Sequence, residues 1–263
     1  MRFLTNGLKG REPMLIDPAK AAEYSARLDK YAFSDVLAKL LGERPVAHVT
    51  ADGVGVIPID GPIGRGVSPI ESMLGATDVN AISVAIDAFE ADPSVKKVAF
   101  RVNSPGGTVA GVPELAAKIR RMKKPTMAYA EEANSAALWL AAAADRVVAM
   151  PSGSVGSVGV YMAIPDYSKA YGDAGVKMVV IKSRQSPLKG AGIEGTSLTE
   201  EQLADLQAQV DDIDEEFMQS IKQTRINVSQ DAFTGGTFSG KKAVQLGLAT
   251  GLADSFEEAL ASF

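Results

Sequence analysis

The segment Arg101–Thr108, with the sequence Arg-Val-Asn-Ser-Pro-Gly-Gly-Thr, most constrains the fold of this chain. It follows the apolar run Val98–Phe100, typical of a buried strand, and precedes a helical pattern from about Val112 to Met122. A loop at the carboxyl end of a strand lines the ligand crevice of an open α/β sheet. Two adjacent glycines there, Gly106 and Gly107, would let main-chain N–H groups approach a bound group. A simple glycine turn between strand and helix is the alternative interpretation.

Strand-like and helical segments alternate through the middle of the chain. Asp78 is a good N-cap, and Ile82, Ile86 and Phe89 recur on one face of the helix that would follow it. The alternating segments are strands at 56–60, 97–102 and 125–130 and helices at 78–91 and 112–122. This order predicts an α/β fold with a parallel sheet.

Three further segments have readable patterns. The glycine-rich segment 61–75 is predicted to be a long loop, and Lys177–Ile181 is predicted to be a strand. Thr199–Gln202 has capping-box spacing and should start a long helix. Its apolar positions recur at steps of three and four, so we expect one buried stripe. That stripe consists of Leu203, Leu206, Val210, Ile213, Phe217 and Ile221.

The first fifty residues differ in pattern from the rest of the chain. They contain two helical patterns separated by polar stretches, and Glu43–Pro45 breaks the second pattern. We therefore expect residues 1–50 to form a partly helical N-terminal extension. Residues 51–263 should form the main domain, which is long enough to bury a sizeable core.

Composition excludes several classes of function. The chain of 263 residues has no cysteine and a single histidine, which excludes thiolate and multi-histidine metal sites and a cysteine nucleophile. Its formal net charge of −5, with no stripe of Lys or Arg, argues against a nucleic-acid partner. No apolar run is long enough to span a bilayer, and the first residues lack the apolar core of a signal peptide. These features predict a cytoplasmic protein that needs no metal and acts without a membrane.

Two glycine-rich segments are poor matches to nucleotide-binding loops. The run Gly153–Gly159 leads into the strand-like segment 158–162, whereas a dinucleotide fingerprint opens a helix. The run Gly235–Lys242 has Lys242 where a P-loop needs Ser or Thr for Mg²⁺. We therefore expect no organic cofactor.

Ser135 stands where a strand-like segment meets an all-apolar run of small residues, Ala136–Ala144. That run should be a buried helix. Ser135 could simply be the N-cap of this helix, a frequent role for serine. Alternatively it could be a nucleophile, since free N–H groups at a helix start stabilise developing negative charge.

A serine nucleophile needs a base within hydrogen-bond reach. His48 precedes the predicted core and is better interpreted as an exposed or edge-strand residue. A lysine can serve only where burial lowers its pKa from about 10.4 towards about 7–8. Lys189, with small and apolar neighbours, fits this need better than Lys182, which lies next to Arg184. A solvated surface charge remains the alternative for either lysine.

Four motifs in order resemble the signal peptide peptidase A family of serine proteases, over about residues 53–260. They are the segments 92–107, 130–141 and 156–160 and the loop that holds Lys189, and the ending Phe238–Asp254 fits as well. Within that family the chain is most similar to the head-maturation proteases of tailed phages and prophages. The opening Glu12–Pro18 contributes to that similarity.

The resemblance implies a ClpP/crotonase-like fold of repeated ββα units and a Ser-Lys dyad. Ser135 would be the nucleophile and Lys189 the base, and the N–H groups of Gly107 and Ala136, with Gly106 as a weaker candidate, would form the oxyanion hole. It further implies an ATP-independent endopeptidase that forms a ring-shaped homo-oligomer. Its substrates would be capsid or scaffold proteins, in the host cytoplasm and conceivably within the procapsid.

Two other classes of function use the same fold. A crotonase-type acyl-CoA enzyme would need carboxylates near the oxyanion hole, for which Glu131 or Glu132 could serve. A non-catalytic capsid assembly protein would keep the fold without the chemistry.

The spacing of Lys189 departs from the family pattern, because its loop is longer than that of relatives.

Overall fold

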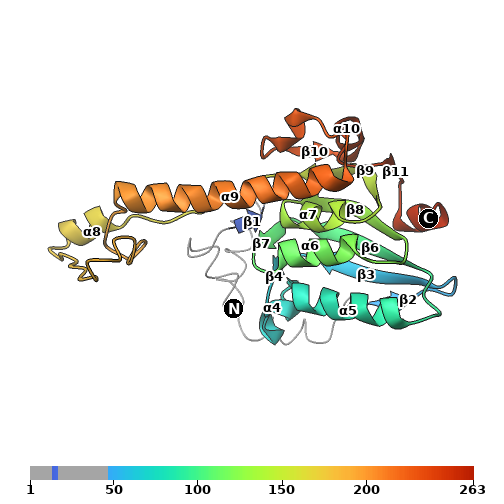
Figure 1. The fold of residues 1–263 in the computed structure, drawn as a ribbon, viewed down its shortest axis with the longest axis horizontal. Helices are drawn as coiled ribbons and strands as arrows, with labels where there is room; N and C mark the ends of the chain where they lie inside the picture. Colours follow the sequence, from blue (N-terminus) through green and yellow to red (C-terminus); the bar gives the residue numbers. More distant parts are fainter. Residues whose placement is uncertain (1–13, 17–46) are drawn as a thin grey trace.

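The computed structural model describes residues 14–16 and 47–263. A seven-stranded sheet runs through its centre, and four of the strands are parallel neighbours (Figure 1). These four are β3 (Val54–Asp60), β6 (Lys97–Ser104), β8 (Thr126–Asn134) and β9 (Arg146–Gly156). Shorter strands complete the sheet: β2 (His48–Val49) pairs with β3, while β10 (Thr237–Ser239) and β11 (Gly251–Leu252) pair with β9. The α/β class predicted from the alternation of strands and helices is confirmed.

A second, four-stranded sheet forms at the carboxyl ends of the parallel strands. Its order is β1 (Met14–Ile16), β7 (Gly106–Thr108), β4 (Ile63–Gly64) and β5 (Thr77–Asp78). The segment 61–75 is therefore not one long loop as predicted. It contains β4 and the short helix α4 (Pro69–Met73), which is started by a capping box between Ser68 and Glu71.

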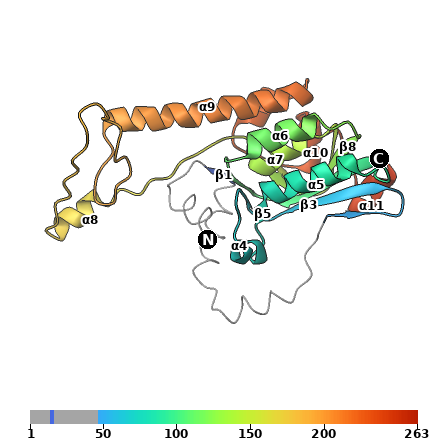
Figure 2. The same ribbon diagram turned by 60° about the horizontal axis from the view of Figure 1, so that its bottom comes forward.

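Helices cover one face of the large sheet (Figure 2). They are α5 (Val79–Ala91), α6 (Val112–Arg120) and α7 (Ala136–Ala142). Strand residues alternate between the faces, so that Phe100 packs under these helices whereas Ala99 and Tyr129 face α11 (Phe256–Ala261) on the other side. Both faces are apolar, as expected of a parallel sheet. The Asp78 cap of α5 is confirmed, since its side chain accepts from the N–H of Asn80.

Every residue of α7 is buried. The helix lies between the sheet and the long helix α9 (Glu200–Thr224), which crosses over it (Figure 1). Trp139 stacks on Phe217 of α9 with ring centroids 4.6 Å apart and donates from Nε1 to Ser220 Oγ at 2.7 Å. Small alanines let α7 sit this close to its neighbours, which confirms the predicted buried helix.

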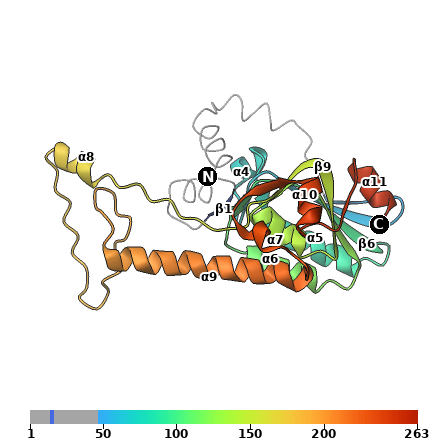
Figure 3. The same ribbon diagram turned by 90° about the horizontal axis from the view of Figure 1, so that it is seen from above.

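The chain between the body and α9 forms an arm, residues 162–199, that projects away from both sheets in all three views (Figures 1, 2 and 3). Its only helix is α8 (Ser168–Asp173). The predicted strand Lys177–Ile181 is wrong: these residues form no strand, and Ile181 is 93% exposed. The apolar run that suggested a strand has no neighbouring strand to pair with.

The apolar stripe of α9 is buried over only part of its length. Phe217 and Ile221 are fully buried against the body, whereas Leu203 is 58% exposed. The helix outruns the sheet that it covers, so its first turns lack a partner within the chain. The expectation of a continuously buried stripe is thus correct only for the second half of α9.

The last elements return to the sheet. After the 3₁₀ helix Gln230–Phe233 the chain forms β10, then α10 (Gly240–Gln245), which packs on β9. The helical patterns predicted within residues 1–50 and the break at Glu43–Pro45 lie outside the described residues. In the part of the chain that is described, no helix combines the length and apolar character needed to cross a bilayer.

The contrast along α9 gives a stability test. Phe217→Ala should lower the free energy of unfolding by about 3–5 kcal/mol, because it removes the ring stacked on Trp139 and leaves a cavity. Leu203→Ala, in the exposed half of the same helix, should change it by no more than about 0.5 kcal/mol. Chemical denaturation of both variants makes the comparison. Equal losses would mean that the exposed first half of α9 supports the fold as much as the buried second half does.

Candidate active site

Ser135 connects β8 to α7 in a strained backbone conformation. Its φ of 54° and ψ of −120° lie outside the regions that L-residues favour, at a cost of about 1–3 kcal/mol. It occupies the N-cap position, yet its side chain makes no capping hydrogen bond. The Oγ atom instead lies 3.5 Å from the carbonyl oxygen of Gly159. A capping role therefore does not explain this serine.

The segment after β9 holds Ser135 in place. The N–H of Ser135 donates to the carbonyl of Gly156 at 2.8 Å. Ser157, next to Gly156, also has a positive φ of 53°, and its N–H donates to Gly236 at 2.7 Å. In the described part of the chain these two serines are the non-glycine residues with positive φ. Backbone strain is thus concentrated around one hydroxyl, as is typical of functional sites.

The two glycines that follow Pro105 begin strand β7, which packs against α7. Gly106 has a φ of 101°, and its N–H donates to Ser104 Oγ at 3.2 Å. A Cβ at Gly107 would lie 1.8 Å from the carbonyl oxygen of Ile63. The second glycine is therefore required by the close approach of β4, and not only by a bound group.

These contacts separate the three amides proposed for an oxyanion hole. The amide of Gly106 is already engaged by Ser104, which makes it the poorest of the three. Ala136 is the first residue of α7, so its N–H has no acceptor within the helix. Gly107 lies on the strand that contacts this helix. The fold brings Ser135, Ala136 and β7 into one region.

Neither candidate lysine belongs to that region. The carbonyl of Lys189 accepts from Gln202 in the first turn of α9 at 3.4 Å, which fixes Lys189 at the arm end of that helix. Val210, which lines the same groove as Val160 beside the Ser135 contact Gly159, lies eight positions further along, or about 12 Å along the helix axis. Lys182 also lies on the arm, where its ammonium group donates to the carbonyl of Pro187. Within one chain, no lysine of the arm meets Ser135.

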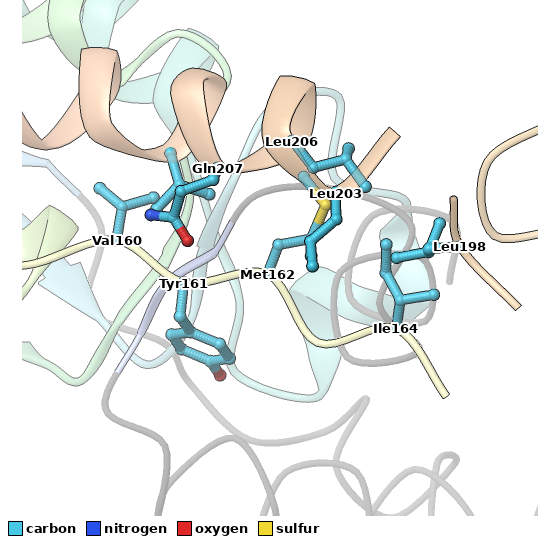
Figure 4. A pocket seen from close by; sticks show the side chains of 9 residues that line it. Val160, Tyr161, Met162, Ile164, Leu198, Leu203, Leu206 and Gln207 are labelled. Carbon is cyan, nitrogen blue, oxygen red and sulfur yellow. The ribbon is translucent and has the colours of Figure 1, made fainter. Parts of the chain in front are cut away.

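An apolar groove lies between α9 and the segment that follows Gly159 (Figure 4). One wall starts at Val160, directly after the Gly159 carbonyl that Ser135 Oγ approaches. The other wall is the exposed half of α9, and the volume enclosed is about 370 Å³. The lining residues are Val160, Tyr161, Met162, Ile164, Leu198, Leu203, Leu206, Gln207 and Val210. The sequence did not reveal this groove, because the stripe of α9 was expected to be fully buried.

The carboxylate Glu131 lies on the face of the large sheet that α11 covers, opposite the face covered by α7. It forms an ion pair with Arg101 at 2.8 Å, and this hydrogen bond raises the pKa of the Arg101 guanidinium. Arg101 in turn lies 5.7 Å from the ring of Phe256 in α11, on the face away from α7. On the same face, burial raises the pKa of Tyr129. Glu132 accepts from Asn134 at 3.3 Å.

Metal binding finds no support among residues 14–16 and 47–263, where no three His, Cys, Asp or Glu side chains cluster. His48 lies on the edge strand β2, where it pairs with Val56 of β3, and it is exposed. This placement agrees with its interpretation as an edge-strand residue.

A family model for peptidase family S49 matches residues 118–262, more than half of the sequence. The chain belongs to peptidase family S49. The predicted resemblance to this family of proteases is thereby confirmed. The matched region includes Ser135, Ala136, the arm and α9, whereas Gly106 and Gly107 precede it.

Relatives of this family member include two phage proteins. The chain is 29% identical to the head-tail preconnector protein GP5 of Enterobacteria phage P21, over 79% of this chain and 42% of that protein. It is 27% identical to the capsid assembly protease C of Escherichia phage lambda, over 93% of this chain and 61% of that protein. The chain therefore spans about half the length of these relatives.

Solved structures similar to this S49 chain include a protease and an enzyme of a different class. The 1510-N membrane-bound stomatin-specific protease, solved with a substrate peptide, matches with a TM-score of 0.46 at 15% identity, over 81% of this chain and 80% of that one. An enoyl-CoA hydratase from Shewanella pealeana matches with a TM-score of 0.48 at 10% identity, over 88% and 75%.

The strain at Ser135 predicts an unusual order of stabilities. Glycine relieves a positive φ, whereas alanine keeps the Cβ that causes the strain. Ser135→Gly should therefore be more stable than Ser135→Ala by about 1 kcal/mol, measured by urea denaturation of both proteins. An ordinary N-cap also favours glycine over alanine, but there replacing serine with glycine lowers the stability by a few tenths of a kcal/mol. Because Ser135 makes no capping bond and has a positive φ, Ser135→Gly should instead be more stable than the parent protein. A Ser135→Gly variant that is less stable than the parent would show that Ser135 is not strained in solution.

Proposed function

We propose that this chain is an ATP-independent serine endopeptidase with Ser135 as its nucleophile. The observation that carries the proposal is the strained serine, held at a strand-to-helix turn and not used as a cap. Membership of peptidase family S49 supports the same activity. Residues 51–263 would form the peptidase domain, with residues 1–50 as an extension.

The proposed reaction is acyl transfer through Ser135. Its Oγ attacks the carbonyl carbon of the scissile peptide while a base takes the hydroxyl proton. The N–H groups of Gly107 and Ala136 donate to the resulting oxyanion, with Gly106 excluded by its bond to Ser104. The base then returns the proton to the leaving amine, and water, activated by the same base, releases the acyl group from Ser135. No metal or organic cofactor takes part in these steps.

The base in this proposal is Lys189 from a neighbouring copy of the chain. It does not contact Ser135 of its own chain, since about 12 Å of α9 separates Gln202, which binds the Lys189 carbonyl, from Val210 at the groove beside Ser135. The arm that carries Lys189 projects from the body and exposes apolar side chains, which favours packing against another molecule (Figure 3). A closed ring, in which each arm reaches the next subunit, would complete every site.

Extended apolar protein segments are the proposed substrates. The groove beside Ser135 is lined mainly by aliphatic side chains and would accept such a segment (Figure 4). The names of two relatives refer to capsid assembly and to a head-tail preconnector. We therefore propose capsid or scaffold proteins as substrates, cleaved in the host cytoplasm or within the procapsid. A crotonase-type activity is less well supported, because Glu131 is paired with Arg101 on the far face of the sheet.

Removing the proposed nucleophile tests the activity directly. Ser135→Ala should lower the rate of cleavage of a protein substrate by at least about 10³-fold, because no other group can form the acyl-enzyme. The parent protein should also react with a fluorophosphonate at Ser135, detected by mass spectrometry. Unchanged turnover in Ser135→Ala would remove Ser135 from the mechanism, whereas unlabelled Ser135 together with no cleavage by the parent protein would favour the non-catalytic assembly protein.

The two arm lysines provide a matched pair. Lys189→Ala should abolish cleavage, whereas Lys182→Ala should retain most of it, and the reverse result would exchange their roles. If the base comes from a neighbouring copy, mixing Ser135→Ala with Lys189→Ala should restore part of the activity, because some sites combine an intact serine with an intact lysine. Mixtures that stay inactive would contradict a shared site.

Assembly can be tested separately from chemistry. Ile181 is 93% exposed, so Ile181→Asp removes no contact within the chain but places a charge on the apolar arm. We expect the oligomer to dissociate, with a lower mass by light scattering and at least about tenfold less activity. Asp173→Asn, an exposed change elsewhere on the arm, should leave the mass unchanged. An intact oligomer in Ile181→Asp would place the interface elsewhere.

A further inference from the structure

Strand β1 occupies an edge of the strand that carries the proposed oxyanion glycine. Met14, Leu15 and Ile16 pair antiparallel with Thr108, Gly107 and Gly106 of β7. The other edge of β7 is taken by β4, where Ile63 pairs with Gly107. A segment from near the start of the sequence thus fills the only neighbouring strand position of β7 that β4 leaves (Figure 1).

A protein substrate would need this same edge. Extended peptides commonly bind enzymes by adding a strand to an exposed sheet edge, where main-chain hydrogen bonds align the scissile bond. On β7 such a strand would place its carbonyl groups next to Gly107. While β1 is paired there, an incoming peptide has no access to that edge.

The burial of Ser135 also indicates that part of the chain must move before a substrate can bind. The residue is only 1% exposed, so a peptide carbonyl cannot reach it unless a covering segment moves. The strand β1 is well suited to move, because it has three residues and pairs with a single strand, β7. Strands as short as this contribute little stability of their own. The deeper strands β6 and β8, by contrast, are paired on both edges.

We propose that Met14–Ile16 is an internal competitor that closes the substrate edge of β7, and that an extended apolar peptide displaces it on binding. This inference rests on the proposed peptidase function for its purpose, but it concerns the occupancy of β7 and can be tested without turnover. The chain itself supplies the occupant, so the preferred ligand should resemble the sequence Met-Leu-Ile.

Two prolines in β1 should open the edge in the full-length chain. Leu15→Pro/Ile16→Pro removes two successive N–H groups, of which one faces β7 in any antiparallel pairing. Asn6→Pro/Gly7→Pro is the matched control, with the same number of prolines outside β1. Both pairs are introduced into Ser135→Ala, so that no bound peptide is cleaved.

The probe is a fluorescent peptide with the sequence of residues 12–17, Glu-Pro-Met-Leu-Ile-Asp, followed by anisotropy. We expect it to bind the β1 variant up to about tenfold more tightly than the control, the factor expected from losing one competing hydrogen bond. A scrambled peptide should show no such gain. Equal affinities for the two variants would overturn the proposal.

Hydrogen exchange in the protein without the two added prolines tests the proposal even if the β1 variant misfolds. The amides of Gly106–Thr108 should exchange faster than those of β8 and become protected when the peptide is added. Exchange as slow as in β8 would show that β1 is a permanent strand, which overturns the proposal. With the Ser135 hydroxyl present, the β1 variant should also react about tenfold faster with a fluorophosphonate. Tighter peptide binding without any labelling of Ser135 would support the competitor while contradicting the peptidase function.

Discussion

The burial of α7 is the constraint on which the rest of the structure depends. A helix made almost entirely of alanine and leucine can lie flat between a parallel sheet and α9, because it has no side chains that would hold them apart. Trp139 fixes its rotation by stacking on Phe217 and bonding to Ser220. These contacts hold the start of the helix beside the end of β8. The chain passes from one to the other through the strained backbone of Ser135.

The rigid body and the arm divide the site between them. In the proposed site the nucleophile Ser135 and the candidate oxyanion donors, the first amide of α7 and strand β7, all come from the body. The candidate base comes from the arm, which the same helix α9 carries away from the body. One long helix thus links the packed core, through Phe217, to the segment of Lys189. If Lys189 of a neighbouring copy is the base, as we propose, a monomer would hold the nucleophile without its base, and assembly would also activate the enzyme.

Much of this arrangement could be predicted from the sequence, and the failures share a cause. The alternation of strands and helices, the Asp78 cap and the buried helix after Ser135 each follow from local pattern, and the structure has all three. The predicted strand Lys177–Ile181 and the fully buried stripe of α9 rest on the premise that apolar residues are buried within their own chain. In the arm and the first half of α9, apolar residues such as Ile181 and Leu203 are exposed instead. The role of Gly107 was also only half predicted, because the close approach of Ile63 is a long-range contact.

If β1 is the competitor that we propose, its pairing with β7 would cost the fold little. Strand β7 is held from one side by β4, and Gly107 fits there only because it lacks a Cβ. Its second edge is left for a strand that contributes little to the core, since β1 pairs with β7 alone. An edge that is never paired would invite unwanted strands from other chains. A weakly held internal strand satisfies the same backbone groups and yields to a peptide that binds better. The weak pairing of β1 with β7 would then both protect the edge and select the substrate.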